Sequence, residues 1–250
     1  MKSHIIVNHR VFETLPEEMF EKDTHEGGEV VVSGRGAVIM FHYDDESLAL
    51  KPYVRGGLPR RFIKETYLYI GLEKTRMWRE FRLLEQMRDY NLPVPVPVAA
   101  RCQVLTPFSY RGDLITRRIP GASSLSDIIS AQSLSDFTWS RIGEKIALFH
   151  QHQVFHIDLN AHNILLTADG KIYLVDFDKC YFRRRSASDT RRWNQATLKR
   201  LHRSLRKLKT RQNEFYFDER KWTVLLDGYN NSSASTTYMQ HPLQNNEAVG

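Results

Sequence analysis

The sequence predicts an α+β fold with two lobes, a β-rich lobe at the N-terminus and a mainly helical lobe after it. Strand-like apolar runs fill residues 29–54, whereas helices are expected near 124–131, 136–152 and 190–209. A break at Ile119-Pro120-Gly121-Ala122 separates these two parts of the chain. We therefore predict an N-terminal lobe over 1–118, a C-terminal lobe over 119–229 and a disordered tail over 230–250.

Three strands are expected at the start of the N-terminal lobe. Runs rich in β-branched residues over 30–32 and 37–41 flank a Gly-x-Gly turn made by Gly34 and Gly36, which indicates a hairpin. A third strand over 48–54 follows the polar turn at 44–46, and Pro52 places it at an edge or near its end. Further strands are expected over 102–107 and 113–118.

The expected helices carry apolar residues at helical spacing. Over 76–90 these include Met77, Phe81 and Leu84, and the proline-rich stretch 92–97 ends this helix. Over 190–209 a stripe of leucines forms the apolar face. From Asn230 onward the chain is rich in Asn, Ser, Thr and Gln, which is typical of disorder.

The composition indicates a globular protein with a basic surface, but it does not identify the reaction or the ligand. With 41% hydrophobic residues the chain can bury a core, and its net charge of +7 favours anionic partners such as nucleic acid, acidic lipids or phosphorylated molecules. Its two cysteines, Cys102 and Cys180, are far apart and fit a reducing cytoplasm. Polar residues interrupt the first twelve positions, so we expect no signal peptide, and no apolar run is long enough for a membrane-spanning helix.

The strongest chemical pattern is H-x-D-x-x-x-x-N, which runs from His156 through Asp158 to Asn163. After an expected hairpin with an Asp-Gly turn, Asp176 ends an apolar strand and precedes Phe177. In phosphoryl transfer such an Asp accepts the proton of the acceptor hydroxyl, while an Asn and a second Asp hold the metal ions. The pattern predicts a protein-kinase-like fold with Asp158 as catalytic base and Asn163 and Asp176 as metal ligands.

Two residues of the N-terminal lobe complete this hypothesis. Lys51 lies in the middle of a strand, from which it can reach phosphates beneath the turn of Gly34 and Gly36. Glu80 lies on the apolar face of the helix over 76–90, and an inward-facing acid needs a charge partner. We expect Glu80 to pair with Lys51. Together with Gly34 and Gly36, these two residues are expected to bind ATP. His156 is expected to support its loop, and His162 either to contact the substrate or to pack.

The residues of this pattern resemble the bacterial lipopolysaccharide kinases, and among them those that act on 3-deoxy-D-manno-octulosonic acid (Kdo). The resemblance is carried by Asp158-Leu159-Asn160-Ala161-His162-Asn163-Ile164-Leu165 and Tyr173-Leu174-Val175-Asp176-Phe177-Asp178, and it covers about 25–229. It implies ATP and Mg²⁺ as cofactors, and transfer to the 4-hydroxyl of Kdo on a lipid A precursor. The implied location is peripheral, at the cytoplasmic face of the bacterial inner membrane.

Basic residues are the expected contacts of this anionic acceptor and of an anionic membrane surface. Between positions 183 and 211 lie 12 of the 36 Lys and Arg residues, against one acid. We expect no nucleic-acid partner and no obligate protein partner. The predicted anion-binding residues, together with His162, are Arg55, Arg60, Arg61, Arg183, Arg184 and Arg185.

The sequence departs from protein kinases at several points. Asp178 stands where those enzymes have Gly, Asn160 replaces a Lys, and no A-P-E motif follows, which argues against a protein substrate. Three alternatives stay open. They are a heptose kinase of the same family, a small-molecule kinase of the aminoglycoside or choline type (which the positive net charge disfavours), and a basic nucleic-acid-binding protein that uses the helix over 190–209.

Overall fold

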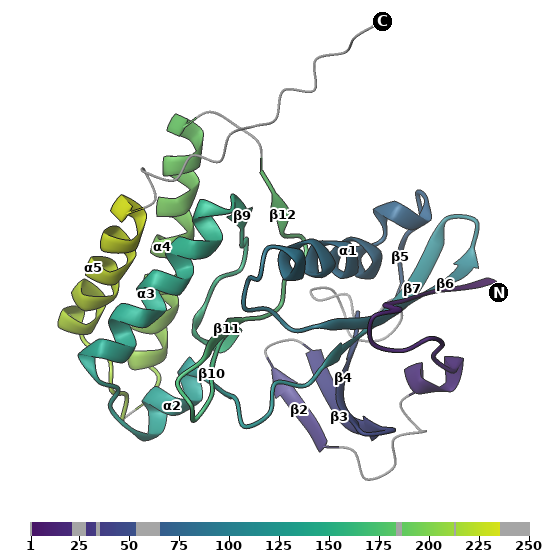
Figure 1. Cartoon of the computed structure of the whole chain (residues 1–250), viewed down its shortest axis with the longest axis horizontal. Helices are drawn as coiled ribbons and strands as arrows, with labels where there is room; N and C mark the ends of the chain where they lie inside the picture. The colour runs from purple at the N-terminus through teal and green to yellow at the C-terminus, as the bar shows by residue number, and fades with distance from the viewer. Residues whose placement is uncertain are drawn as a thin grey trace, which may run out of the picture.

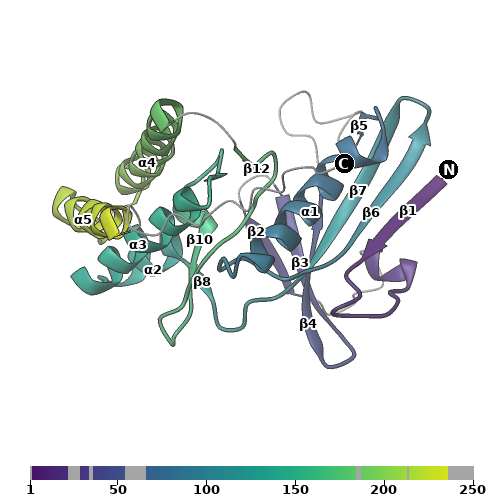
Figure 2. The same ribbon diagram turned by 45° about the horizontal axis from the view of Figure 1, so that its top comes forward.

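The computed structural model describes residues 2–21, 29–33, 36–53, 66–183, 187–212 and 214–235. An antiparallel sheet with one covering helix forms one side of the molecule, and a group of helices forms the other (Figures 1 and 2). The chain is thus of the α+β class, as the sequence predicts.

The larger sheet is antiparallel throughout and has the strand order β1-β6-β7-β4-β3-β2, with β5 paired to β7. Its strands are β1 (Lys2–Val7), β2 (Glu29–Ser33), β3 (Gly36–Tyr43), β4 (Glu46–Pro52), β5 (Tyr67–Leu68), β6 (Pro97–Thr106) and β7 (Ser109–Arg117). The hairpin expected around the Gly-x-Gly turn is present, because Ser33 pairs with Gly36. In β4 the side chains of Leu48 and Leu50 are fully buried, and Lys51, which follows Leu50, pairs in register with Leu114.

Helices dominate the second half of the chain. They are α2 (Leu125–Ala131), α3 (Asp136–Gln151), α4 (Ala187–Lys209) and α5 (Glu219–Ser235), whereas α1 (Arg76–Asp89) packs on the larger sheet. Serine caps begin two of them, since Ser124 accepts from the N–H of Asp127 and Ser135 from that of Thr138. Short strands connect the helices: β8 (Ser123–Ser124), β9 (Val154–Phe155), β10 (Ile164–Leu166), β11 (Ile172–Leu174) and β12 (Tyr181–Phe182).

Most of the expected elements are confirmed, including α1, α2, α3 and the β10–β11 hairpin. Helix α4 begins at Ala187, before the expected start at residue 190. The expected start of a disordered tail at Asn230 is wrong, because α5 continues to Ser235. Close packing of α5 on α3 explains why the chain is helical there. A Cβ at Gly143 would lie 2.0 Å from the carbonyl oxygen of Leu225, so the two backbones touch where glycine allows it.

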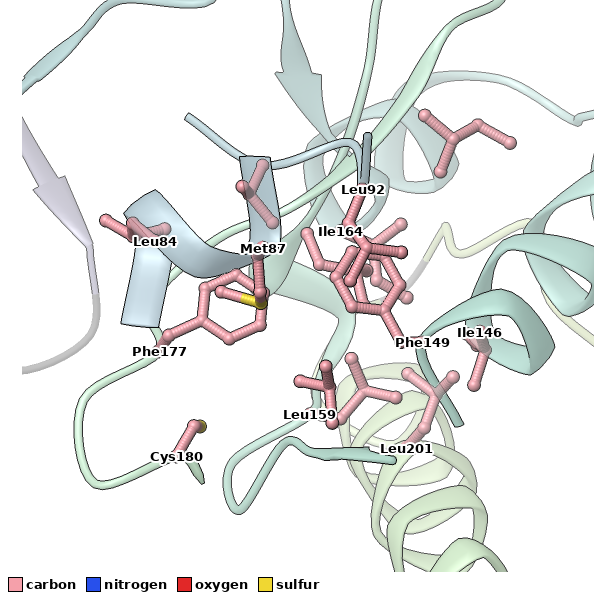
Figure 3. Packing of buried hydrophobic residues seen from close by; sticks show 14 of the residues in the cluster. Leu84, Met87, Leu92, Ile146, Phe149, Leu159, Ile164, Phe177, Cys180 and Leu201 are labelled. Atoms are coloured by element: carbon pink, nitrogen blue, oxygen red, sulfur yellow. The ribbon is translucent and has the colours of Figure 1, made fainter. Parts of the chain in front are cut away.

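One hydrophobic cluster connects α1 of the sheet side with the helices of the other side. Figure 3 shows Phe177 pointing toward Met87 of α1, with Leu159 and Leu201 among the residues of the same cluster. Phe177 also stacks on Phe149 of α3, with ring centroids 5.9 Å apart. The residues on either side of Phe177 are therefore held at a fixed place between the two halves of the molecule.

Within the described ranges, no helix has an apolar stretch long enough to cross a membrane.

Candidate active site

The ammonium group of Lys51 and the carboxylate of Glu80 form the predicted ion pair. Lys51 Nζ lies 3.0 Å from Oε1 and 2.9 Å from Oε2 of Glu80. The side chain of Glu80 is only 3% exposed and that of Lys51 is 26% exposed. Glu85, the other acid near the middle of α1, pairs instead with Arg82 at the surface. The apolar face of the helix thus identified the inward-facing acid correctly.

Glu80 is also held from two other directions. The hydroxyl of Tyr53 donates to its Oε2, and the backbone N–H of Phe177 donates to its Oε1 at 3.2 Å. Burial, and next the Glu80 carboxylate, raise the pKa of Tyr53 well above its usual value, so this hydroxyl stays a donor. A single buried carboxylate therefore joins strand β4, helix α1 and the segment that follows β11.

Lys51 contacts a second carboxylate, that of Asp176, at 2.6 Å from Oδ1. Burial by itself lowers the pKa of Lys51, but its two carboxylate neighbours outweigh this effect and raise it. Likewise burial would raise the pKa of Asp176, yet Lys51 outweighs it and holds that pKa below its ordinary value. Both groups are therefore charged at neutral pH.

The backbone around Asp176 is fixed by the segment that contains Asp158. The N–H of Val175 donates to the carbonyl of Asn163 at 3.1 Å, and the carbonyl of Val175 accepts from Nε2 of His156 at 3.0 Å. Asp176 itself has a φ of 64°, an uncommon conformation for a residue other than glycine. Because burial lowers the pKa of His156, the ring is neutral, and it supports the loop as expected from the sequence.

Asn163 and Asn160 shape the loop that carries Asp158. Both side-chain amides donate to the carbonyl oxygen of Asp158, at 3.0 Å and 2.8 Å. The side-chain oxygen of Asn160 then accepts from the N–H of His162, which caps the short 3₁₀ turn of residues Ala161–Asn163. Asp158 is thus presented on an ordered loop, with its side chain 52% exposed.

The exposed carboxylate of Asp158 is in contact with Arg200 of α4. Nε of Arg200 lies 2.8 Å from Oδ1 of Asp158, and its terminal Nη2 lies 2.5 Å from the same oxygen. The two residues are 42 positions apart in sequence. Helix α4 therefore supplies one wall beside the predicted catalytic base.

Asp178, two residues after Asp176, forms a further ion pair with Arg76. Nε of Arg76, at the first position of α1, lies 2.8 Å from Oδ1 of Asp178, and a terminal nitrogen of Arg76 contacts the other carboxylate oxygen. The residue that replaces the glycine of protein kinases thus ties this segment to the start of α1. Glu80 ties the same segment to the middle of α1.

The donor set fits Mg²⁺. The side-chain nitrogen of Asn163 donates to the carbonyl of Asp158, which leaves its carboxamide oxygen as the atom that suits a cation, and the carboxylate of Asp176 offers further oxygens. Oxygen donors are those that Mg²⁺ prefers, and at kinase sites it takes only one or two protein ligands together with phosphate oxygens. Accordingly, the described residues hold no group of three or more His, Cys, Asp and Glu side chains that would bind a metal by themselves.

Other predicted residues lie apart from this network or outside the described residues. Arg183 stacks on aromatic rings, with its guanidinium carbon 3.0 Å from the ring centroid of Trp193 and 5.5 Å from that of Tyr181. His162 is exposed, and Gly36 lies at the start of β3. The remaining predicted residues, which lie outside the described residues, are Gly34, Arg55, Arg60, Arg61, Arg184 and Arg185.

Sequence reasoning missed four participants: Tyr53, Arg76, Asp178 and Arg200. Tyr53 could have been found, because residues two apart in a strand share a face and Tyr53 follows Lys51 at that spacing. Asp178 stood out only as a departure from the glycine of protein kinases. Nothing in local spacing indicates Arg76 or Arg200, since their partners are 102 and 42 residues away.

Comparison with known proteins agrees with this arrangement. Residues 24–229 match the model of the lipopolysaccharide kinase (Kdo/WaaP) family. The chain is 37% identical over 204 residues to the 3-deoxy-D-manno-octulosonic acid kinase of Mannheimia succiniciproducens, a match that covers 79% of this chain and 82% of the relative. It is 39% identical over 175 residues to the Vibrio cholerae kinase of that name, covering 70% and 72%, and 38% identical over 230 residues to that of Haemophilus influenzae, covering 88% and 92%.

Among solved structures, the chain resembles WaaP in complex with acyl carrier protein. The TM-score is 0.56 at 12% identity, and the match covers 91% of this chain and 89% of the other, which shows a shared kinase-like fold. The family model and the relatives establish more than the fold. The chain belongs to the lipopolysaccharide kinase (Kdo/WaaP) family and is a phosphotransferase.

Proposed function

We propose that this chain is an ATP-dependent kinase that phosphorylates the 4-hydroxyl of Kdo on a Kdo–lipid A precursor. The observation that carries the proposal is the position of Lys51 between Glu80 and Asp176, next to the loop of Asp158. An ammonium group between two carboxylates is suited to exchange one of them for phosphate oxygens. The names of the relatives supply the acceptor.

Each residue has a definite task in this proposal. When bound, ATP supplies the γ-phosphoryl group and Mg²⁺ neutralises charge on its phosphate oxygens. Asn163 and Asp176 hold the cation through their side-chain oxygens, while Lys51, oriented by Glu80, binds the α- and β-phosphates. Asp158 accepts the proton of the acceptor hydroxyl on its carboxylate.

The structure supports a division between rigid and exposed parts of this site. Glu80 and Asn163 are buried and hydrogen-bonded to neighbouring groups, whereas the carboxylate of Asp158 is half exposed, where an acceptor can approach. Rigid support for the groups that bind phosphate and an open approach for the hydroxyl are what phosphoryl transfer to an external acceptor requires.

The same proposal places the protein at an anionic membrane surface, peripherally and on the cytoplasmic side. Its acceptor is a lipid, and α4 carries exposed bases such as Arg192, Arg203 and Lys207. Each such base adds about 1 kcal/mol of attraction near acidic lipid. Replacing these three with Glu is expected to weaken binding to vesicles of phosphatidylglycerol and phosphatidylethanolamine; unchanged binding would contradict this location.

A panel of acceptors tests the proposed reaction. We expect ATP consumption with Mg²⁺ and a Kdo–lipid A precursor, phosphate on the Kdo residue by mass spectrometry, and little transfer to a heptose-terminated core or to kanamycin. Transfer to heptose in preference to Kdo would show that the proposed acceptor is wrong, while the assignment as a kinase would stand. Failure to bind ATP would reject the enzyme reading altogether.

A further inference from the structure

Arg200 and Asp158 form a contact that the proposed reaction does not explain. Two nitrogens of the guanidinium group lie at 2.8 Å and 2.5 Å from the single oxygen Oδ1 of Asp158. The acceptor hydroxyl has to donate its proton to this same carboxylate. Arg200 therefore stands where the acceptor has to bind.

Stability is a poor explanation for this ion pair. The side chains of Arg200 and Asp158 are 45% and 52% exposed, and exposed pairs contribute little to folding because water and salt screen them. Helix α4 is anchored by other residues, since Leu201 and Leu205 on its inner face are fully buried. An arginine that can leave without unfolding the helix is free to bind another anion.

The chemistry of the acceptor points to that anion. The relatives act on an octulosonic acid, so the sugar that presents the hydroxyl also carries a carboxylate. A guanidinium group binds a carboxylate through two parallel N–H···O bonds, whichever molecule the carboxylate belongs to. The carboxylate of Asp158 and that of the acceptor are thus alternative partners of one side chain.

We propose that Arg200 recognises the carboxylate of the acid acceptor, and that its contact with Asp158 is the resting position of this side chain. The inference rests on the proposed function, because it takes Asp158 as the base and an acidic sugar as the acceptor. Binding of the acceptor turns Arg200 from Asp158 to the sugar carboxylate, which frees the base and orients the hydroxyl in one event. A neutral sugar would leave Arg200 on Asp158, so the pair also discriminates against acceptors without an acid group.

The test combines a substitution with a change in the acceptor. Initial rates are measured for the wild type, Arg200→Ala and Arg200→Lys, with the Kdo–lipid A precursor and with the same lipid after reduction of its Kdo carboxylate to a primary alcohol. The matched control is Arg220→Ala on α5, because the guanidinium group of Arg220 is likewise exposed and likewise pairs with an aspartate, Asp136.

We expect Arg200→Ala to lower kcat/KM for the acid acceptor by about 10- to 100-fold, mainly through KM, which is the effect of one charged hydrogen-bonded pair. The KM for ATP is expected to stay the same, Arg200→Lys to recover part of the loss, and Arg220→Ala to resemble the wild type. With the reduced acceptor Arg200→Ala should have a kcat/KM equal to or higher than that of the wild type, because its Asp158 is no longer held by Arg200. Thermal unfolding of each variant checks that α4 is intact.

Several results would overturn the inference. An equal loss on both acceptors would assign Arg200 to the support of Asp158, and a raised KM for ATP would assign it to a phosphate. Unchanged kinetics would make the contact an ordinary surface ion pair. Absence of transfer to the acid acceptor by the wild type would instead reject the proposed function, and this inference with it.

Discussion

Replacing Glu80 with Gln removes the charge at the centre of the site while keeping the size of the side chain. Glu80 accepts four hydrogen bonds, two from Lys51 and one each from Tyr53 and the N–H of Phe177. A Gln can accept on one oxygen only, and its amide N–H groups would face donors. Breaking one partner out of a buried ion pair costs about 3–5 kcal/mol, and because Lys51 is 26% exposed and keeps Asp176, we expect about 2–3 kcal/mol here.

Activity should fall with stability in this variant. Lys51 would be held by Asp176 alone, and a shift of the order of 1 Å in a positioned group costs about 100-fold in rate. Urea unfolding and steady-state kinetics measure the two effects. The matched control is Glu85→Gln on the same helix, where the pair with Arg82 at 3.1 Å is exposed and contributes at most about 0.5 kcal/mol.

A double-variant cycle separates the ion pair from simple loss of packing. Once Lys51 is replaced by Met, Glu80→Gln should cost much less than it does in the wild type, because the interaction is already gone. The account of Glu80 would be refuted if Glu80→Gln kept its activity within threefold of wild type, or if it unfolded at the same urea concentration as Glu85→Gln.

Three further predictions concern the supports of the site. Arg76→Ala should lower kcat and destabilise the protein by about 1–3 kcal/mol, because the N–H groups of Arg76 hold the partly buried carboxylate of Asp178. Arg79→Ala on the next turn should do neither, and equal kinetics of the two variants would contradict this role of Arg76. Burial lowers the pKa of His150 to about 3, so the stability that its neutral form contributes is complete above the unfolded pKa of 6.5 and is lost as the pH falls from there toward 3. Unfolding free energies at pH 5.0 and 7.5 should therefore differ less in His150→Gln than in the wild type, by up to about 1.4 kcal/mol per pH unit, while the exposed His9→Gln keeps the wild-type dependence, and an unaltered slope in His150→Gln would contradict the assignment. Gly143→Ala should destabilise the protein by about 3 kcal/mol or more, because its Cβ would meet the backbone of α5 at 2.0 Å, and a variant as stable as the exposed Asp227→Ala would show that α5 does not pack there.

Local patterns predicted the elements that depend on neighbours in sequence. The β10–β11 hairpin follows from its Asp-Gly turn, and the two serine caps begin α2 and α3 where the sequence placed those helices. The Lys51–Glu80 pair was also predictable. Lys51 lies in a strand among apolar residues, and the apolar face of the helix over 76–90 selects Glu80 as the inward-facing acid in place of Glu85. In such cases the local signal and the tertiary contacts favour the same structure.

Elements that depend on distant partners were not predictable in this way. Strand β1 exists because it pairs with β6, about a hundred residues later in the chain, and its own residues alternate poorly. The end of α5 is rich in Asn and Ser, which favours disorder, but contact with α3 through Gly143 and Gly228 outweighs that tendency. The approach of Arg200 to Asp158 likewise follows from how α4 packs, not from its sequence.

Asp158→Asn tests the central claim most directly, because it keeps the shape of the proposed base and removes its ability to take a proton. Transfer to the Kdo–lipid A precursor and binding of ATP with Mg²⁺ are measured side by side for this variant and the wild type. The account predicts unchanged nucleotide affinity and a rate of transfer lower by about 10²- to 10⁴-fold, the usual contribution of a general base. Transfer at the wild-type rate by Asp158→Asn would contradict it.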